Sequence, residues 1–249
     1  MLVDTHCHIH ESYKLPIDEV LAHAEKNDVT RMICVGTSEL SSRQAIDFVE
    51  THDNCFASIG VHPHDTKDGW DEITRLAGTS EKIVAVGEIG LDYFYTHSPR
   101  EVQIEALKAQ IEVALKHNLP IIFHVRDAFD DFWPIFDSYS GIRGVLHSFT
   151  DSKENMQKAV ERGLYIGVNG ISTFTKDETQ KNMFDAIPLG HLLFETDAPF
   201  LTPIPYRGKI NEPAYVREIA EYHAQRRGIS LQEISDASSQ NARAVFNLH

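Results

Sequence analysis

Metal-binding side chains recur where apolar segments of this sequence end. Five such segments carry imidazole or carboxylate groups, which belong to His6, His8, Glu88, His124, His147 and Asp197. Imidazoles and carboxylates are ligands of divalent ions such as zinc, and a bound ion can activate water for hydrolysis. Side chains this far apart in sequence converge when parallel strands close into a barrel, because the strand ends gather at one mouth. The pattern therefore indicates a metallohydrolase.

The first segment, residues 3–8, carries two histidines separated by one residue. On a strand, residues two apart share a face and lie roughly 6.6 Å apart along the chain. We therefore expect His6 and His8 to bind one ion together, while Cys7 points to the opposite side. A single histidine is more often a packed or surface residue than a ligand, so the other segments are needed to support this interpretation.

Each of the other segments leads from an apolar run to one ligand-type side chain. They are residues 83–93 with Glu88, 119–127 with His124, 144–149 with His147 and 192–199 with Asp197. A buried carboxylate is costly unless it is paired or bound to a cation, so Glu88 is predicted to bridge two ions. We expect the glycines that flank it, Gly87 and Gly90, to leave space for an ion and its waters.

Each of these residues also has an ordinary structural interpretation. Glu88 suits a helix cap or an ion pair, His124 a packed core imidazole, His147 a turn, and Asp197 a turn before Pro199. Taken singly, the ordinary interpretation is favoured for each of them. Their recurrence at five apolar strand ends favours the metal site.

The elements that would position these residues alternate along the chain. Apolar runs begin near Leu2, Thr30, Cys55, Ile83, Leu119, Gly144, Leu164 and Leu192, with amphipathic stretches between them. Residues 100–117 show helical spacing, and residues 213–249 predict two more helices broken at Gly228, with Ser230 as a cap. The length of 249 residues matches the roughly 250 typical of a (β/α)8 barrel. We expect one α/β domain over residues 1–249, a TIM barrel with its metal site at the C-terminal mouth of the strands.

The net charge of −14 has the wrong sign for a protein that coats duplex nucleic acid by neutralising phosphates. It leaves room for an enzyme that holds a few phosphates through metal ions and local cations, of which Arg126, Arg207 and Lys209 are candidates. Such an enzyme would favour chain ends and short oligomers. The alternative for these cations is a solvated surface.

The three cysteines, Cys7, Cys34 and Cys55, have no metal-type or disulfide-type spacing. A sparse, odd set is typical of a reducing compartment. No apolar stretch approaches the roughly 20 residues of a membrane span, and Met1 leads directly into a strand and not a signal sequence. We expect a soluble cytoplasmic protein.

The ordered motifs resemble the TatD-like metal-dependent deoxyribonuclease family of the amidohydrolase-like superfamily. The resemblance covers essentially the whole chain, in DTHCH at 4–8, GVHPH at 60–64, GEIGLDY at 87–93, PIIFHVRDA at 120–128, ETDAP at 195–199 and NEPAYV at 211–216. Two departures stand out. The family usually has a cysteine and a Gly-Ser turn where this chain has Ser148, Thr150 and Asp151, and often an arginine where Ile210 stands.

The ligand set and the resemblance together imply a two-ion hydrolase. His6, His8, Glu88 and Asp197 would hold one divalent ion, and Glu88, His124 and His147 the second. Asp197 would also accept a proton from the attacking water, while the family pattern suggests that His62 contacts the scissile group. Zinc suits the histidines, with magnesium or manganese as alternatives. By strand alternation, Asp4 and Glu195 would lie one layer beneath His6 and Asp197 and orient them, or form a buried polar pair.

Three functions remain open at this point. The first is a deoxyribonuclease that trims DNA ends, 3'-5' exonuclease-like, with His62 and Arg126 binding substrate. The second is an amidohydrolase-type enzyme that cleaves C–N, ester or lactone bonds, because fold does not fix substrate. The third is a metal or oligonucleotide binder without catalysis, which the intact ligand set disfavours. We expect a monomer with no obligate protein partner and no membrane attachment.

Overall fold

The computed structural model describes residues 1–248, which contain eight β-strands. The strands are β1 (Leu2–Cys7), β2 (Val29–Val35), β3 (Cys55–Ile59), β4 (Ile83–Asp92), β5 (Ile121–Arg126), β6 (Gly144–Leu146), β7 (Tyr165–Val168) and β8 (Leu192–Phe194). They form one sheet in the order β1 to β8, and the recorded pairings are parallel. Sequential parallel strands alternating with helices define the TIM barrel. The predicted fold class and its eight strands are confirmed.

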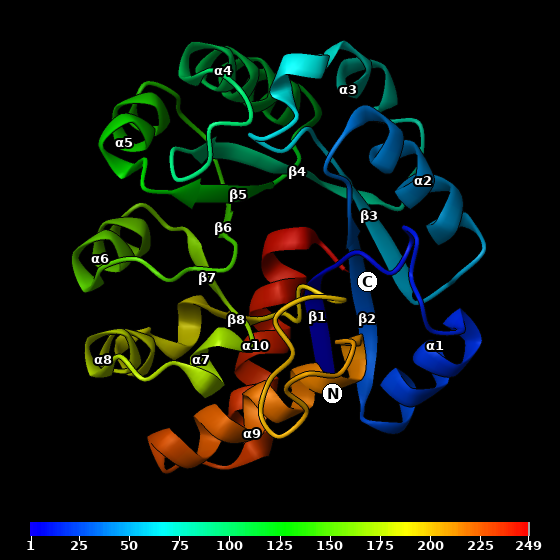
Figure 1. The fold of residues 1–249 in the computed structure, drawn as a ribbon, viewed down its shortest axis with the longest axis vertical. Helices are drawn as coiled ribbons and strands as arrows, with labels where there is room; N and C mark the ends of the chain where they lie inside the picture. Colours follow the sequence, from blue (N-terminus) through cyan, green and yellow to red (C-terminus); the bar gives the residue numbers. More distant parts are fainter. Residues whose placement is uncertain (249) are drawn as a thin grey trace. The chain divides into compact units, whose positions relative to one another are not determined.

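Helices follow the strands along the chain, as the colours of Figure 1 trace. They are α1 (Ile17–Lys26), α2 (Glu39–Glu50), α3 (Asp71–Leu76), α4 (Arg100–His117), α5 (Phe129–Asp137), α6 (Lys153–Glu161), α7 (Ile171–Phe174), α8 (Glu178–Ala186), α9 (Val216–Arg227) and α10 (Leu231–Phe246). Single 3-10 turns occur at Thr66–Asp68, Leu189–His191 and Pro213–Tyr215. Two compact units result, one of residues 34–147 and the other of residues 1–33 together with those from 148 onward.

In the unit of residues 34–147, β4 pairs with β5 in parallel. Their register sets Gly90 opposite His124 and Asp92 opposite Arg126. Helix α4 packs along β4 (Figure 1) and has the bounds predicted from its apolar spacing. Behind β5, the ring of Phe123 packs edge-on to Phe132 of α5, with centroids 5.1 Å apart. This packing fixes β5, and with it the side chain of His124.

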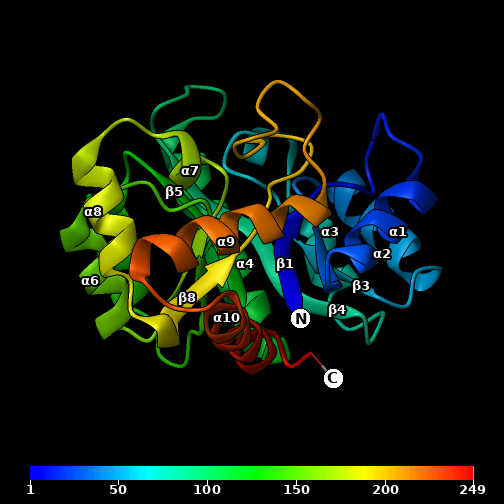
Figure 2. The same ribbon diagram turned by 90° about the horizontal axis from the view of Figure 1, so that it is seen from below.

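In the other unit, the first strand meets the last. A parallel bridge joins Cys7 to Ala198, and the hydroxyl of Thr5 donates to the carbonyl of Phe194 at 3.1 Å. Helices α9 and α10 lie against β1 and β8, as Figure 2 shows from below. The ends of β1 and β8 are therefore held together by backbone and side-chain contacts.

Helix α9 ends, and helix α10 begins, where the sequence predicts. Gly228 caps α9 in the left-handed conformation, with φ of 65°, which glycine adopts without a Cβ penalty. Ser230 caps α10, because its hydroxyl accepts the N–H of Glu233 at 3.1 Å. The last residue of the predicted tail, His249, lies outside the described residues.

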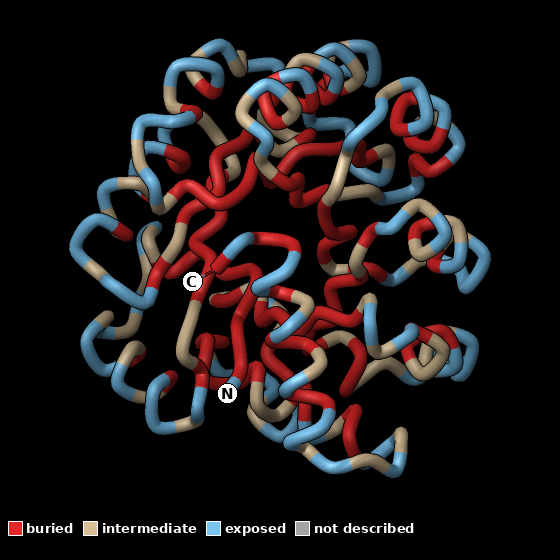
Figure 3. The backbone as a smooth tube through the Cα atoms, turned by 180° about the vertical axis from the view of Figure 1, so that it is seen from behind, coloured by how far each residue is buried: buried red, intermediate tan, exposed pale blue. Residues whose placement is uncertain are grey.

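Burial follows the strands and one face of each helix, which Figure 3 shows as mostly red in the sheet and alternating colours outside it. Every residue of β1 and β4 is buried. Cys7, Cys34 and Cys55 are buried free thiols. Within residues 1–248, no helix combines the length and apolarity needed to cross a membrane.

Candidate metal centre

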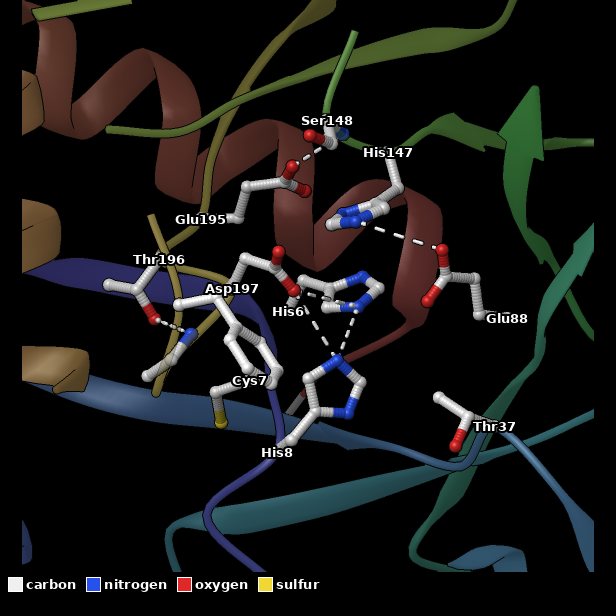
Figure 4. A network of polar contacts seen from close by, with 12 residues as sticks. His6, Cys7, His8, Thr37, Glu88, His147, Ser148, Glu195, Thr196 and Asp197 are labelled. Carbon is white, nitrogen blue, oxygen red and sulfur yellow. Dashed lines mark hydrogen bonds and ion pairs between the residues drawn. The ribbon is translucent and has the colours of Figure 1, made fainter. Parts of the chain in front are cut away.

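Two imidazoles and a carboxylate converge where β1 ends (Figure 4). The Nε2 atoms of His6 and His8 lie 3.2 Å apart. Oδ1 of Asp197 lies 3.3 Å from Nε2 of His8 and 3.7 Å from Nε2 of His6. His6 is fully buried and His8 is 6% exposed, so these atoms meet away from bulk water.

The spacing of these three atoms fits a divalent ion. Ligand atoms bound tetrahedrally to zinc at about 2.1 Å are separated from one another by about 3.4 Å. The three separations, 3.2, 3.3 and 3.7 Å, lie close to that value. The donor set of two imidazoles and one carboxylate is also one that zinc accepts. His6, His8 and Asp197 therefore suit a metal centre.

Backbone contacts aim Asp197 at the histidines. Its φ of 58° is left-handed, a conformation that aspartate tolerates better than most residues, and its N–H donates to the carbonyl of His6 at 2.8 Å. Beneath it, the Asp4 carboxylate accepts the N–H and hydroxyl of Thr196 at 2.8 and 2.6 Å. Burial raises the pKa of Asp4 to about 7, although the hydrogen bonds from Thr196 oppose that rise. Asp4 thus joins β1 to the segment that carries Asp197.

A second cluster surrounds Glu88 in the unit of residues 34–147. Its Oε1 lies 2.7 Å from Nδ1 of His124, 3.6 Å from Nε2 of His62 and 3.8 Å from Nε2 of His147. The Glu88 residue is only 4% exposed. A buried carboxylate needs a compensating partner. The three imidazoles around this Glu88 oxygen can hold a metal cation beside it. Glu88, His124 and His147, each predicted from a different strand end, are brought together here.

Two residues of this cluster were missed by the sequence reasoning. Oδ2 of Asp92 lies 2.9 Å from Nε2 of His124 and 3.0 Å from Nε2 of His64. A carboxylate on the far nitrogen of a ligand histidine fixes which nitrogen faces the metal. Asp92 belongs to the GEIGLDY motif and His64 to the GVHPH motif. Membership of these motifs was the only feature of the sequence that could have pointed to the two residues.

The cluster shifts the pKa values of His124 and His62 in opposite directions. Burial alone would lower the pKa of His124, but hydrogen bonds to Asp92 and Glu88 raise it to about 9. Burial, reinforced by the nearby His124, lowers the pKa of His62 to about 3. Nδ1 of His62 accepts the N–H of His64 at 3.1 Å, which leaves the proton of this neutral ring on Nε2, facing Glu88.

Gly87 and Gly90 do not leave the space around Glu88 that the sequence analysis predicted. A Cβ at Gly90 would lie 1.8 Å from the carbonyl oxygen of His124, and a Cβ at Gly87 would lie 2.7 Å from that of Ile122. The space that a side chain would need is filled by the backbone of β5. The prediction that these glycines leave room for an ion and its waters was wrong, because they permit the close approach of β4 to β5.

The departures from the family pattern at Ser148 and Asp151 serve local structure. The N–H of Ser148 donates to Oε1 of Glu195 at 2.6 Å, and its hydroxyl accepts from Asn169 at 2.7 Å. Oδ1 of Asp151 accepts from Asn155, within α6, at 2.7 Å. Glu195 therefore holds the backbone of Ser148, the second residue after β6.

The three cations proposed from sequence are all exposed, and each lies over an aromatic ring. The guanidinium of Arg126 lies 3.9 Å from the ring centre of Phe94, and that of Arg207 lies 3.9 Å from the ring centre of Phe174. Nζ of Lys209 is 5.1 Å from the ring centre of Tyr206. Of the three, only Arg126 belongs to the unit that contains the Glu88 cluster.

A model of the family described as TatD related DNase matches residues 3–247. The chain belongs to the TatD-related DNase family. YabD of Bacillus subtilis (strain 168), described as an uncharacterized metal-dependent hydrolase, is 38% identical over 256 residues, covering the whole of both chains. The 3'-5' ssDNA/RNA exonuclease TatD of Salmonella typhimurium is 37% identical, with 93% of each chain covered.

The crystal structure of YjjV, a TatD homologue from Escherichia coli K12, superposes on this TatD-family chain with a TM-score of 0.92. It is 27% identical, and the match covers 100% of this chain and 98% of YjjV. The TIM barrel is thus the fold of a family relative as well. The TatD-family chain is a metal-dependent hydrolase, and its histidine and carboxylate groups are able to hold an ion.

Proposed function

We propose that this TatD-family hydrolase is a deoxyribonuclease that trims DNA ends from 3' to 5'. The observation that carries the proposal is the convergence of three imidazoles on one oxygen of Glu88. A buried carboxylate ringed by imidazoles suits a bridge between two ions, which is how many phosphodiesterases clamp the attacking and leaving oxygens. The description of the Salmonella relative as an exonuclease of single-stranded DNA and RNA supports the substrate class.

We assign the ions as the sequence suggested. His6, His8, Glu88 and Asp197 would hold one, and Glu88, His124 and His147 the other, since strand ends share one mouth in a TIM barrel. Zinc is our first choice, with magnesium or manganese as alternatives, because imidazoles favour zinc and carboxylates accept all three. When bound, such ions would lower the pKa of water and offset charge on the phosphoryl oxygens.

Asp197 is the proposed proton acceptor. Its side chain is 15% exposed, more than that of His6 or His8, so water can reach it while it faces both imidazoles. A carboxylate in hydrogen-bond reach of the attacking water can take its proton. The left-handed turn at Asp197 holds the group in this position before substrate arrives.

His62 is the proposed donor to the scissile group. Because its pKa lies near 3, the ring is neutral at physiological pH, and its Nε2 carries the proton. A preorganised N–H aimed at a developing negative charge stabilises the transition state. Arg126 is the proposed contact to a neighbouring phosphate. A net charge of −14 opposes binding along a duplex and favours single-stranded ends.

Oligonucleotides labelled at either end test this function. Protein stripped of metal and then supplied with zinc, manganese or magnesium should convert a 5'-labelled single strand into a ladder, and should release the 3' label as a mononucleotide. Asp197→Asn purified in parallel controls for contaminating nuclease, and His52→Gln, at the end of α2, controls for the loss of a histidine. If the metal-supplied enzyme leaves every oligonucleotide intact and cleaves amides or lactones, the amidohydrolase alternative replaces this proposal.

A further inference from the structure

Two exposed aromatic rings in the loop after β4, and a cation at the end of β5, lie next to the Glu88 cluster. Phe94 is 53% exposed and Tyr95 is 42% exposed, and their ring centroids lie 4.7 Å apart in an edge-to-face arrangement. The guanidinium of Arg126 lies over both rings, 3.9 Å from the centre of Phe94 and 5.1 Å from that of Tyr95. We call these three residues the aromatic platform. Aromatic rings this exposed need an explanation, since burial is their favoured state.

One carboxylate holds both the platform and the histidine cluster. Oδ1 of Asp92 accepts the N–H groups of Phe94 and Tyr95 at 3.0 and 3.1 Å. Oδ2 of the same Asp92 lies 2.9 Å from Nε2 of His124. Asp92 thus ties the backbone of this loop to one of the proposed metal ligands.

Arg126 extends this arrangement outward along β5. It stands two residues beyond His124 and opposite Asp92 in the register, so it shares the face of His124 at a distance of roughly 6.6 Å along the strand. Arg100 and Arg226 are paired with carboxylates, whereas within residues 1–248 no carboxylate pairs with Arg126. Its guanidinium is held by rings, which leaves its N–H groups able to donate to a ligand.

We propose that the aromatic platform binds the nucleotide adjoining the scissile bond, with its base stacked on Phe94 and its phosphate held by Arg126. This inference rests on the proposed nuclease function and adds a subsite to it. Every base has a π-face, so a stacking ring accepts any sequence, and the planar guanidinium matches phosphate oxygens with paired N–H donors. Tyr95 supports the platform, because its ring is stacked on His97 with centroids 5.5 Å apart.

Abasic oligonucleotides separate stacking from other effects of the ring. On a natural single strand, Phe94→Ala should lower kcat/KM about tenfold, mainly through KM, since stacking on one aromatic ring contributes on that scale. An abasic residue at the 3'-terminal or the adjoining position should lower the kcat/KM of the wild type by the same factor. On that abasic strand, Phe94→Ala should cause no further decrease in kcat/KM. Phe94→Trp should retain activity. Phe48→Ala, which removes a ring stacked on His52 at the end of α2, is the matched control and should leave both substrates unchanged.

The phosphate contact has its own test. Arg126→Ala should raise KM, and this increase should disappear when the phosphate beside the cleaved bond is replaced by an uncharged methylphosphonate. Equal losses for Phe94→Ala on natural and abasic strands, in an enzyme that cleaves both, would overturn the stacking proposal and leave the nuclease function standing. A wild type that cleaves no oligonucleotide with any of the metals would instead overturn the nuclease function and, with it, the platform.

Discussion

Asp92 and His124 join the GEIGLDY and PIIFHVRDA motifs, with Oδ2 of the aspartate 2.9 Å from Nε2 of the histidine. The opposite nitrogen of His124 lies 2.7 Å from Glu88. A carboxylate behind a ligand histidine fixes the tautomer and the ring orientation, and raises the basicity of the nitrogen that faces the metal. Asp92 would therefore act on the proposed metal through His124.

Asp92→Asn removes this charge while keeping the shape of the side chain. Because outer partners of this kind typically contribute 10- to 100-fold to metal affinity, we expect zinc affinity to fall about tenfold or more. Competition with a chromophoric chelator measures the change. Asp131→Asn is the matched control, since Asp131 pairs with Arg100 on the surface of the same unit. An unchanged affinity in Asp92→Asn would remove Asp92 from the metal centre.

Asp197→Asn tests the proposed proton acceptor. The amide keeps an oxygen that can face His6 and His8 but lacks the basicity needed in the transition state. Turnover of a single-stranded oligonucleotide should fall at least roughly a hundredfold, in line with general-base contributions, while metal content measured by elemental analysis falls less. A variant that turns over at the wild-type rate would exclude Asp197 as the base.

The sequence predicted those parts of the structure that depend on local pattern. Apolar runs marked all eight strands, and the spacing in residues 100–117 and the glycine at 228 marked helix bounds. Strand alternation placed His6 and His8 together. Asp92 and Phe94 were missed because their contacts depend on which strand lies beside β4 and in which register, and no local pattern contains that information.

The role of Gly90 illustrates the same limit and gives a further prediction. A methyl group there would lie 1.8 Å from the carbonyl oxygen of His124, so Gly90→Ala must push β4 away from β5. We expect a loss of about 3 kcal/mol in the free energy of unfolding, at the upper end of overpacking effects, measured by urea denaturation. Gly190→Ala is the control, because nothing lies within 4 Å of its added methyl group. Equal stability of the two variants would contradict the close approach.

His223 of α9 should make stability depend on pH. It is 1% exposed and its Nε2 donates to the hydroxyl of Ser172 at 2.9 Å, because that hydroxyl donates to Asn169. Burial, with a smaller effect from Arg227, lowers the pKa of His223 from 6.5 to about 3. The unfolded chain therefore binds more protons between these values, so this stability is complete above about pH 6.5 and is lost as the pH falls toward 3.

His223→Gln isolates this effect, since glutamine does not titrate. The free energy of unfolding of wild type, relative to that of the variant, should decrease on going from pH 7 to pH 5, with a slope that approaches about 1.4 kcal/mol per pH unit. Urea denaturation at several pH values gives both curves. Parallel curves would show that His223 is not buried as a neutral ring.

The measurement that tests the central claim most directly is anomalous X-ray scattering from crystals soaked in zinc or manganese. We predict one peak within bonding distance of His6, His8, Glu88 and Asp197, and a second within bonding distance of Glu88, His124 and His147. The peaks should lie roughly 3.5–4 Å apart, as in two-ion hydrolases. Soaked crystals with no anomalous peak at these side chains, or with peaks only elsewhere, would contradict the two-ion account of this protein.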